Sequence, residues 1–434
     1  MLKVALNTII LTLKAIFNYQ LHVYFLHILF LGNRNLEVMK YFMWLTTVSF
    51  LLMLYAYSTY TAVQNCRNNI INPVYVNMEV RSEKTEMSDG KHVLGTRSIP
   101  SGNHTFTILW HNSPSYFLKK ANISLKRCRF NNCHITTDLE QTAHADVVIF
   151  RHNYLPVTPP VKRDPNQIWV LFSMESPFYI RRNYQKKEWQ NRFNWTITYG
   201  KDSDIQMTYA SIVKEVKYIK KNYSEIFERK TKYVAWIVSH CSAISDRDEY
   251  VRELQKYIPV DIYGKCGNYT CSRNGTICMD GINNNYKFYL SFENSLCTDY
   301  VSEKILWMFD HKYNIIPVVR GAPNIDTFLP RKTYVNVYDF SSPEMLANHL
   351  LNIGSDEREY ISYIREKDKY KPYFASYYRA MCALCEKMNR YNISKIIDTD
   401  NWFQIKKNCI IPQNVSQVYD LEIQNKLPDY WYWE

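Results

Sequence analysis

Tyr286-Lys-Phe-Tyr-Leu-Ser-Phe292 runs directly into Glu293-Asn-Ser-Leu-Cys-Thr-Asp-Tyr-Val-Ser-Glu-Lys304, and Ile315-Ile-Pro-Val-Val-Arg-Gly321 follows soon after. The first and last stretches are nearly continuous apolar runs, which is typical of parallel strands covered on both faces. Asp299 is a candidate N-cap for a helix that we expect from Tyr300 to about Phe309. Strand, helix and strand in this order predict a doubly wound α/β domain.

The same alternation extends in both directions from this stretch. Downstream, Ser342-Pro343 predicts the start of another helix with proline at its first position. Upstream, Ser245-Asp-Arg-Asp248 has capping-box spacing and predicts a helix that begins there. We therefore expect two α/β domains that face each other across a cleft. Further buried-strand candidates lie at residues 105–110, 145–150, 168–172, 233–238 and 259–264.

The composition of the chain excludes several classes of protein. Its 434 residues are enough for two or three domains. Hydrophobic residues make up 46% and charged residues 22%, which argues against a disordered chain and against a polytopic membrane protein. The net charge of +12 comes from Lys and Arg spread along the chain, with local density only at residues 214–232. A solvated helix face accounts for that segment, so we expect no nucleic-acid partner.

The chain has 11 cysteines, and none of them lies in the first 65 residues. This enrichment indicates an oxidising compartment and disulfides, with at least one thiol left without a partner in the chain. A zinc site built on Cys382-Ala-Leu-Cys385 is the alternative, but no second Cys/His pair lies at finger spacing.

Residues 41–66 contain no Asp, Glu, Lys or Arg, and their apolar core is long enough to span a bilayer. Basic residues outnumber acidic ones before this core, which predicts a cytosolic N-terminus and a lumenal C-terminus. If the apolar stretch 15–33 also spanned the membrane, the C-terminal part of the chain would return to the cytosol. This stretch is absent from the protein if translation starts at Met39. Eight Asn-x-Ser/Thr sequons favour the lumen, and they lie at Asn103, Asn122, Asn194, Asn222, Asn268, Asn274, Asn392 and Asn414.

These features predict six segments along the chain: a cytosolic N-terminal segment, a signal-anchor helix, a polar stem, two α/β domains and a tail that packs back. Their boundaries are 1–40, 41–60, 61–103, 104–225, 226–390 and 391–434.

The stretch from Phe292 to Lys304 is the candidate binding site. In an open α/β sheet, ligands bind beyond the carboxyl ends of strands and near helix N-termini. Backbone N–H groups, Lys304 and Tyr300 would there face a diphosphate and a ribose. An ordinary surface helix with solvated charges is the alternative that the residues leave open.

This stretch resembles the donor-site signature of the α1,3/4-fucosyltransferases, over residues 286–304 and 316–321. Further segments follow in the order of that family and extend the resemblance over residues 104–390. They are Cys128 to Asp138, Met174-Glu-Ser-Pro177, Asp202 to Gln206, Val238-Ser-His240, Val260 to Gly264, Asp339 to Pro343, and Cys382 to Cys385.

The resemblance implies a two-domain enzyme of the GT-B class, anchored in the Golgi membrane by one span with its catalytic domain in the lumen. It implies an inverting transfer of fucose from GDP-β-L-fucose to the 3-hydroxyl of a GlcNAc on a glycoprotein N-glycan. Core and antennal acceptors both stay open, as does the oligomeric state. The extra cysteines of the second half resemble those of invertebrate core-type members.

Site residues are carried over on the matching motif positions. The resemblance implies that Glu175 is the general base for the acceptor hydroxyl. Glu293 would either orient its neighbours or touch the ligand, and both roles stay open. The positions that match the donor site are Arg247, Asn294, Tyr300, Glu303 and Lys304.

Two further implications concern metal and disulfides. Asp202-Ser-Asp204 resembles an Asp-x-Asp metal motif, but the resemblance is to a metal-independent class, so we expect no required metal and at most stimulation by a divalent cation such as Mn²⁺. The family links two N-terminal cysteines to a C-terminal Cys-x-x-Cys, which implies that Cys128 and Cys133 pair with Cys382 and Cys385.

The chain departs from the family pattern at two places. Gly200 stands where the family commonly has Arg, and residues 305–314 replace a Trp-x-Asn-Ala-Leu pattern with one extra residue. An inserted residue turns the remainder of a helix by about 100°. A catalytically impaired homologue that binds nucleotide sugar or glycan is therefore the alternative to an active transferase.

Overall fold

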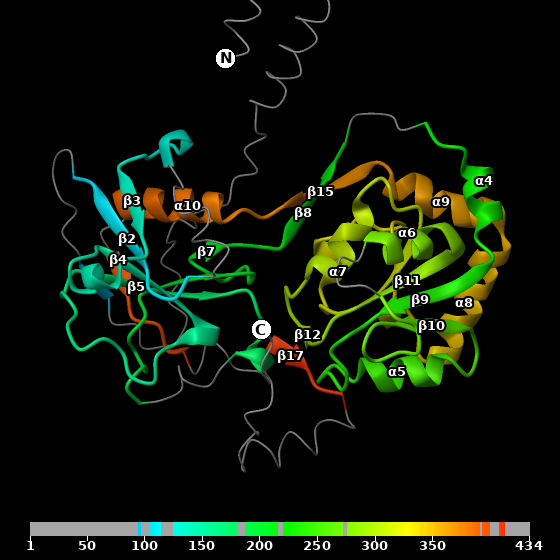
Figure 1. Cartoon of the computed structure of the whole chain (residues 1–434), viewed down its shortest axis with the longest axis horizontal. Helices are drawn as coiled ribbons and strands as arrows, with labels where there is room; N and C mark the ends of the chain where they lie inside the picture. Colours follow the sequence, from blue (N-terminus) through cyan, green and yellow to red (C-terminus); the bar gives the residue numbers. More distant parts are fainter. Residues whose placement is uncertain are drawn as a thin grey trace, which may run out of the picture. The chain divides into compact units, whose positions relative to one another are not determined.

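The computed structural model of the chain is built around two parallel sheets, each with helices on its faces (Figure 1). It describes residues 94–96, 104–113, 125–180, 187–215, 220–271, 276–390, 393–399 and 408–412. The predicted cytosolic segment, the signal-anchor helix and most of the stem lie outside these residues. Within the described ranges, no helix combines the length and the apolar composition that a membrane span requires.

The first sheet has six parallel strands in the order β3-β2-β4-β5-β6-β7. We call this sheet and its covering helices the six-stranded unit. Alternate residues of the strands enter two separate cores, as expected for a sheet covered on both faces. The strands are β2 Phe106–Trp110, β3 Cys133–Thr136, β4 Val147–Arg151, β5 Ile168–Ser173, β6 Trp195–Thr198 and β7 Ile205–Gln206.

The second sheet has five parallel strands in the order β10-β9-β11-β13-β14, and with its helices it forms the five-stranded unit. Its central strand β11 is buried along its whole length. The strands are β9 Lys232–Ile237, β10 Val260–Tyr263, β11 Tyr286–Phe292, β13 Ile316–Arg320 and β14 Val335–Asn336. The strands expected at 233–238, 259–264, 286–292 and 315–321 are thereby confirmed.

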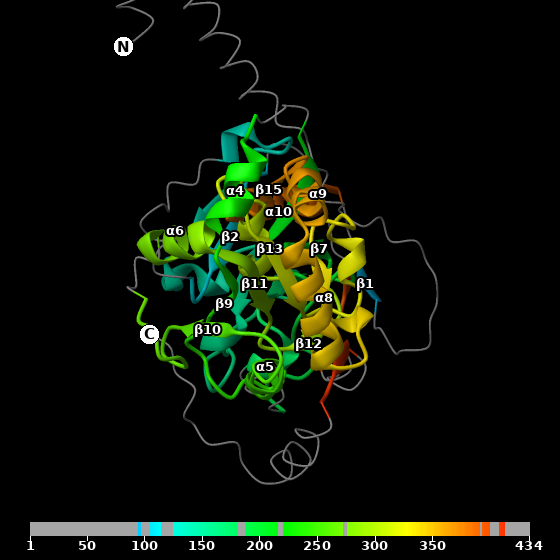
Figure 2. The same cartoon turned by 90° about the vertical axis from the view of Figure 1, so that its right-hand side faces the viewer.

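Helices cover both faces of the five-stranded sheet. One face packs against α5, α8 and α9, and the other against α6 and α7. In Figure 2, α8 and α9 lie on the side that faces the viewer. The helices are α4 Tyr223–Arg229, α5 Arg247–Leu254, α6 Thr276–Asn285, α7 Glu303–Leu306, α8 Pro343–Ser355 and α9 Glu357–Lys367.

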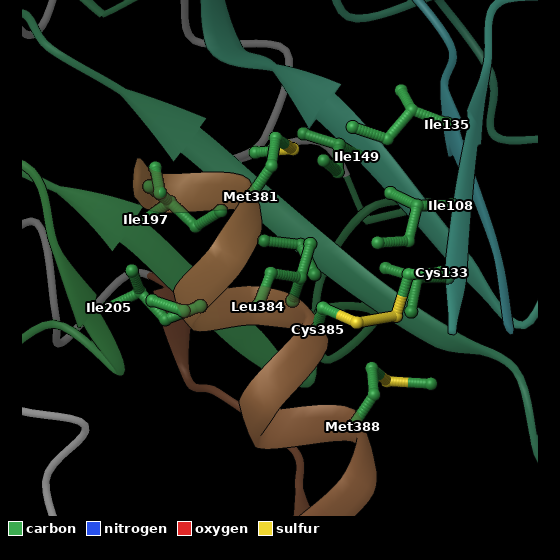
Figure 3. Close-up of a cluster of buried hydrophobic side chains, with 14 of the residues drawn as sticks. Ile108, Cys133, Ile135, Ile149, Ile197, Ile205, Met381, Leu384, Cys385 and Met388 are labelled. Carbon is green, nitrogen blue, oxygen red and sulfur yellow. A yellow bond between two sulfur atoms is a disulfide. The ribbon is translucent and has the colours of Figure 1, made fainter. Parts of the chain in front are cut away.

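The last long helix, α10 (Tyr377–Arg390), belongs to the core of the six-stranded unit. Its buried face, which includes Met381, Leu384 and Met388, packs on isoleucines of the sheet (Figure 3). The predicted boundaries assigned these residues to the second domain, 226–390. A helical pattern does not indicate which sheet the helix covers. The chain reaches α10 through β15 (Tyr370–Phe374), which pairs antiparallel with β8 (Ala210–Lys214).

Two further antiparallel pairs join distant parts of the chain. In the predicted stem, β1 (Leu94–Thr96) pairs with β16 (Ile393–Lys395), so these three stem residues are part of the fold. In the donor-site stretch, β12 (Leu296–Cys297) pairs with β17 (Cys409–Ile410). In both pairs, a short strand of the tail pairs with a strand that precedes it in the chain.

The helix expected from Tyr300 to Phe309 is shorter than the sequence indicates. Asp299 has a left-handed backbone (φ 64°), and Ser302 caps α7 instead by accepting a hydrogen bond from the Lys304 N–H. After Leu306 the chain passes into a 3-10 turn at Trp307–Phe309. Ser302 is a favourable N-cap residue. The acidic Glu303 that follows it in the first turn interacts favourably with the helix N-terminus.

The other short 3-10 segments lie in connections between strands and helices. They are η1 Leu125–Arg127, η2 Leu139–Ala143, η3 His152–Tyr154, η4 Pro177–Tyr179, η7 Ile325–Thr327 and η8 Val337–Asp339.

Candidate functional site

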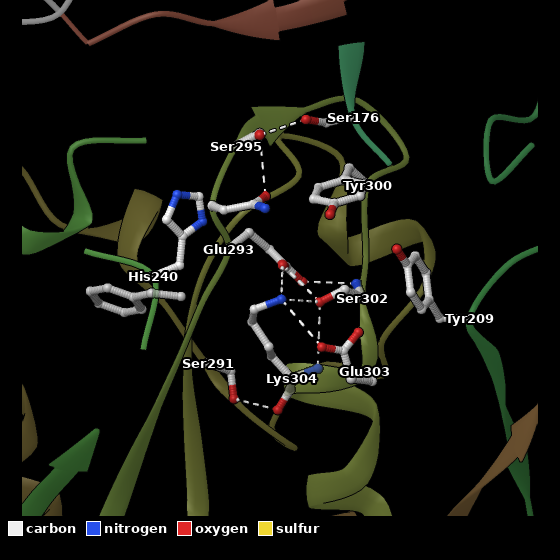
Figure 4. Close-up of polar contacts among 12 residues, drawn as sticks. Ser176, Tyr209, His240, Ser291, Glu293, Ser295, Tyr300, Ser302, Glu303 and Lys304 are labelled. Atoms are coloured by element: carbon white, nitrogen blue, oxygen red, sulfur yellow. Dashed lines mark hydrogen bonds and ion pairs between the residues drawn. The ribbon is translucent and has the colours of Figure 1, made fainter. Parts of the chain in front are cut away.

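A buried carboxylate organises the stretch that follows β11. Glu293 is only 2% exposed. Its Oε1 accepts a hydrogen bond from the Ser302 N–H and its Oε2 accepts one from the Ser302 hydroxyl, both at 2.8 Å (Figure 4). Two hydrogen bonds from one residue fix the loop between β12 and α7 at the carboxyl end of the sheet. Of the two roles left open for Glu293, these contacts are those of a residue that orients its neighbours.

Lys304 lies in the first turn of α7, and its ammonium is surrounded by acceptors. Nζ donates to the Ser302 Oγ at 2.9 Å, and it lies 3.3 Å from a carboxylate oxygen of Glu293 and 3.4 Å from one of Glu303. Burial lowers the pKa of Lys304, but the two carboxylates outweigh burial, so the pKa lies above its ordinary value. The group therefore carries a positive charge at neutral pH.

Glu175 approaches the same stretch from the other sheet. It lies two residues beyond β5, and its Oε2 accepts a hydrogen bond from the Tyr300 hydroxyl at 3.1 Å. Burial raises the pKa of Glu175, although Tyr300 and the charge of Lys304 act in the opposite direction. Burial also raises the pKa of Tyr300 well above 10, which keeps the phenol a donor. A carboxylate poised in this way is suited to accept a proton.

Arg247, the first residue of α5, is buried, and it contacts the backbone around the site. Nη1 donates to the carbonyl of Phe292 and Nη2 donates to the carbonyl of His240, each at 2.8 Å. Its Nε finds no hydrogen-bond acceptor among the described residues. Burial lowers the pKa of Arg247, which nevertheless remains a cation. The guanidinium therefore ties the end of β11 to the loop after β9.

A pair of serines joins the two units beside the site. The hydroxyls of Ser176 and Ser295 lie 2.6 Å apart, and Ser295 also donates to the Asn294 Oδ1 at 3.2 Å. Ser176 follows Glu175 directly, so this contact holds the Glu175 loop against the donor-site stretch. Sequence reasoning missed both serines and Ser302. For Ser302, its position before Glu303 was a usable N-cap signal.

In the Asp202-Ser-Asp204 segment, which resembles an Asp-x-Asp motif, Asp204 has structural contacts. A carboxylate oxygen of Asp204 accepts hydrogen bonds from the N–H and hydroxyl of Thr196. Its other oxygen lies 3.4 Å from the ammonium of the buried Lys387, which comes from α10. Within the described ranges, no group of three His, Cys, Asp or Glu side chains is arranged to hold a metal ion. Independence from metal remains a prediction.

The two departures from the family pattern, Gly200 and residues 305–314, lie on either side of the donor-site stretch in the sequence. Gly200 is buried, and the next residue, Lys201, contacts the five-stranded unit: its N–H donates to Asp299 and its Nζ donates to Thr327, each at 2.9 Å. The altered stretch 305–314 begins after Lys304, and the change to a 3-10 turn lies downstream of the site. Both departures therefore leave Glu303 and Lys304 in place.

The disulfides pair Cys128 with Cys382 and Cys133 with Cys385, as the resemblance implied. Three more lie in the second half: Cys241–Cys266, Cys271–Cys278 and Cys297–Cys409. Cys66 lies outside the described residues.

One predicted glycosylation site is wrong. Asn194 is 5% exposed, and its side-chain oxygen accepts a hydrogen bond from the Trp169 N–H, so it has no room for a glycan in the folded chain. Asn222 and Asn268 are exposed. The other five candidates, Asn103, Asn122, Asn274, Asn392 and Asn414, lie outside the described residues.

Comparisons with known proteins match most of the described chain to one family. A model described as "Fucosyltransferase, N-terminal" matches residues 103–210, and one described as "Glycosyltransferase family 10 (fucosyltransferase) C-term" matches residues 227–402. A solved α1,3-fucosyltransferase with GDP aligns with a TM-score of 0.46 and 16% identity, over 69% of this chain and 94% of that chain.

Two curated relatives match much of this chain, and the second of them is matched over most of its own length. "Glycoprotein 3-alpha-L-fucosyltransferase A" of Drosophila melanogaster is 34% identical over 70% of this chain, which spans 62% of that protein's length. A 4-galactosyl-N-acetylglucosaminide 3-alpha-L-fucosyltransferase of Pan troglodytes is 32% identical over 74% of this chain and 89% of its own length. The chain therefore belongs to the fucosyltransferases of glycosyltransferase family 10.

Proposed function

We propose that this chain transfers L-fucose from GDP-β-L-fucose to the 3-hydroxyl of a GlcNAc on glycoprotein N-glycans, with inversion at the fucose C1. The observation that carries this proposal is the hydrogen bond from Tyr300 to Glu175. It joins a half-buried carboxylate of the six-stranded unit to the stretch of the five-stranded unit that holds Lys304. Membership of the family and the Drosophila relative's printed name support a glycoprotein acceptor.

The chemistry assigns a separate role to each unit. Glu175 accepts the proton of the acceptor hydroxyl while the oxygen of that hydroxyl forms the new bond to C1 of fucose. The bond from C1 to the diphosphate oxygen breaks on the opposite face, and GDP leaves with the electron pair. Lys304 offsets the charge that develops on the departing diphosphate. Its raised pKa keeps it cationic while this happens.

The remaining donor residues act around Lys304. Arg247 holds the carbonyls of Phe292 and His240 in place and brings its positive charge to the end of β11. Asn294, Tyr300 and Glu303 complete the proposed GDP-fucose site. No metal is required in this proposal because Lys304 and Arg247 supply the positive charge.

The proposed location is the Golgi lumen, with one membrane span before the catalytic part. Five disulfides within the described residues support an oxidising compartment. Exposure of Asn222 and Asn268 is compatible with N-glycosylation there.

A second candidate, a homologue that binds the donor without transferring fucose, is favoured by one observation. Both Nη atoms of Arg247 are already occupied by backbone carbonyls, which leaves less of the guanidinium for the diphosphate. Such a homologue would bind GDP-fucose and yield no fucosylated product.

The test uses the full-length chain purified in detergent, with GDP-fucose and a panel of N-glycans that differ in core and antennae. Mass spectrometry of the products reads the acceptor and the linkage. The proposal expects an α1,3-linked fucose on a GlcNAc. Donor binding without any product would favour the second candidate, and a different linkage or acceptor class would contradict the first.

A further inference from the structure

A cavity of about 330 Å³ lies in the five-stranded unit, away from the donor-site stretch. Lys232 and Tyr286, the first residues of β9 and β11, line it, whereas Glu293 follows the last residue of β11. With a rise of roughly 3.3 Å per residue, the two ends of β11 are about 20 Å apart. The cavity is therefore separate from the proposed transfer site.

One face of α6 forms a wall of the cavity. Cys278, Gly281, Ile282 and Asn285 line it, and their spacing places them on the same side of the helix. A methyl group at Gly281 would meet no atom within 4 Å, and no unusual backbone angle requires glycine there. Glycine inside a helix is less favourable than alanine. Gly281 therefore weakens the helix, although neither a neighbouring atom nor a backbone angle excludes a side chain there.

Tyrosines and one ion pair supply the polar groups. The hydroxyls of Tyr263 and Tyr286 lie 2.9 Å apart, and Asp261 accepts hydrogen bonds from the Tyr286 hydroxyl and from the Lys232 ammonium. The Lys232–Asp261 pair has a separation of 2.8 Å and no net charge. A bound anion or cation would have to compete with this pair, so the lining favours a neutral ligand.

A glycosylation sequon borders the same cavity. Asn268-Tyr269-Thr270 includes Thr270, which lines the cavity, and the exposed Asn268. The Tyr269 ring stacks on the ring of Tyr263, with centroids 5.0 Å apart. A sugar attached to Asn268 would begin two residues from the cavity wall.

We propose that this cavity binds a neutral pyranose of an N-linked glycan. A pyranose has an apolar C–H face that can lie on a tyrosine ring, and its hydroxyls can bond to Asn285, Lys232 and the tyrosine hydroxyls. The volume is near the lower end of the roughly 300–1,000 Å³ of ligand sites, which suits one small ring system. The sugar comes either from the chain's own glycan at Asn268 or from a glycan of another glycoprotein.

The binding is tested without GDP-fucose, so that its outcome is independent of the proposed transfer reaction. Saturation-transfer NMR on the full-length chain in detergent uses N,N′-diacetylchitobiose as the probe. The first comparison is between Gly281→Leu, which fills the cavity, and Asp280→Leu, which changes an exposed neighbour on the same helix. We expect Gly281→Leu to weaken binding at least about tenfold, or roughly 1.4 kcal/mol, and Asp280→Leu to leave it unchanged.

Two further variants keep the test decisive if Gly281→Leu does not fold. Gly281→Ala adds one methyl group to open space and should weaken binding in the same direction if Gly281→Leu does not fold. Tyr269→Ala removes the stacked ring but keeps the sequon, and it should also weaken binding. Thermal unfolding of each variant checks that the fold is retained.

The source of the sugar is decided by Asn268→Gln, which removes the attached glycan. All comparisons of cavity variants are therefore made in two backgrounds, one with Asn268 intact and one that carries Asn268→Gln. Probe binding only after Asn268→Gln supports occupation by the chain's own glycan, and binding in both backgrounds supports a glycan from another protein. The proposal is overturned if neither background binds the probe, or if Gly281→Leu, Gly281→Ala and Tyr269→Ala bind it as well as Asp280→Leu does.

Discussion

The two parallel sheets of this chain are completed in different ways. The strands of the five-stranded unit and its donor-site stretch follow one another between Lys232 and Asn336, so the unit is nearly contiguous in sequence. The six-stranded unit needs α10 from much later in the chain, held by disulfides that close separations of 254 and 252 residues. Glu175 therefore depends on long-range closure, whereas Lys304 depends on its immediate neighbours.

The largest expected effect is a loss of fucose transfer when the six-stranded unit loses its proton acceptor, Glu175. Glu175→Gln removes the proton acceptor but can still accept the Tyr300 hydrogen bond, so fucose transfer should fall by about 10²–10⁴-fold, the usual worth of a general base. GDP binding, measured by calorimetry, should change little. Glu140→Gln, at an exposed position of the same unit, is the matched control. Retention of full transfer by Glu175→Gln would remove Glu175 from the mechanism.

The matching change in the five-stranded unit should have a somewhat smaller effect. Lys304→Met removes a charge that stabilises the leaving diphosphate, and we expect a loss of about 10²–10³-fold in transfer, as for one electrostatic donor. In contrast to Glu175→Gln, this variant should also weaken GDP binding. Lys312→Met replaces an exposed lysine nearby and should behave as wild type. Unchanged GDP binding in Lys304→Met would contradict the proposed role.

Disulfides offer a comparison of stability between the units. By the loop-entropy relation, opening both Cys128–Cys382 and Cys133–Cys385 with four serines should lower the free energy of unfolding by more than about 5 kcal/mol, because only the loss of both bonds opens the long loop. Opening the short Cys271–Cys278 loop should cost roughly 2–3 kcal/mol. Denaturant unfolding of the two variants measures the difference. Equal losses, or a larger loss for Cys271–Cys278, would show that closure by α10 is not what stabilises the six-stranded unit.

The smallest expected effect is a displacement of the pH profile. Glu175 acts as a base only when ionised, and burial raises its pKa, so kcat/KM should fall as the pH drops through a value above the ordinary glutamate pKa of about 4.3. The Tyr300 hydrogen bond lowers this pKa, so Tyr300→Phe should move the acidic limb to higher pH. A limb that stays in place or moves to lower pH would contradict the assignment.

The difference between the units also explains which features could be predicted from the sequence. The strands at 286–292 and 316–320 were predictable because apolar runs there are local, and the adjoining motif identified Tyr300, Glu303 and Lys304. The start of α7 was misplaced because Asp299 and Ser302 are both good caps by residue type. In the structure, Asp299 has a left-handed backbone and its carboxylate accepts hydrogen bonds from Lys201 and Asn324, whereas Ser302 accepts one from the Lys304 N–H.

Most contacts between distant residues were beyond the sequence. No local pattern indicates that Ser176 meets Ser295, or that Arg247 bonds to the carbonyls of Phe292 and His240. The contact of α10 with the first sheet followed only from the disulfide pairing that the resemblance implied. Asn194 shows the same limit, since a sequon does not reveal the burial of its asparagine. Each of these depends on how separate elements pack.

The central claim is that the two units act on one reaction, and the most direct measurement is the stoichiometry of that reaction. Purified full-length chain is incubated with GDP-fucose and an N-glycan acceptor, and fucosylated product and released GDP are quantified together. We predict one α-linked fucose on a GlcNAc for each GDP released, and loss of both in Glu175→Gln. GDP release without fucosylated acceptor, or full coupling in Glu175→Gln, would contradict the account.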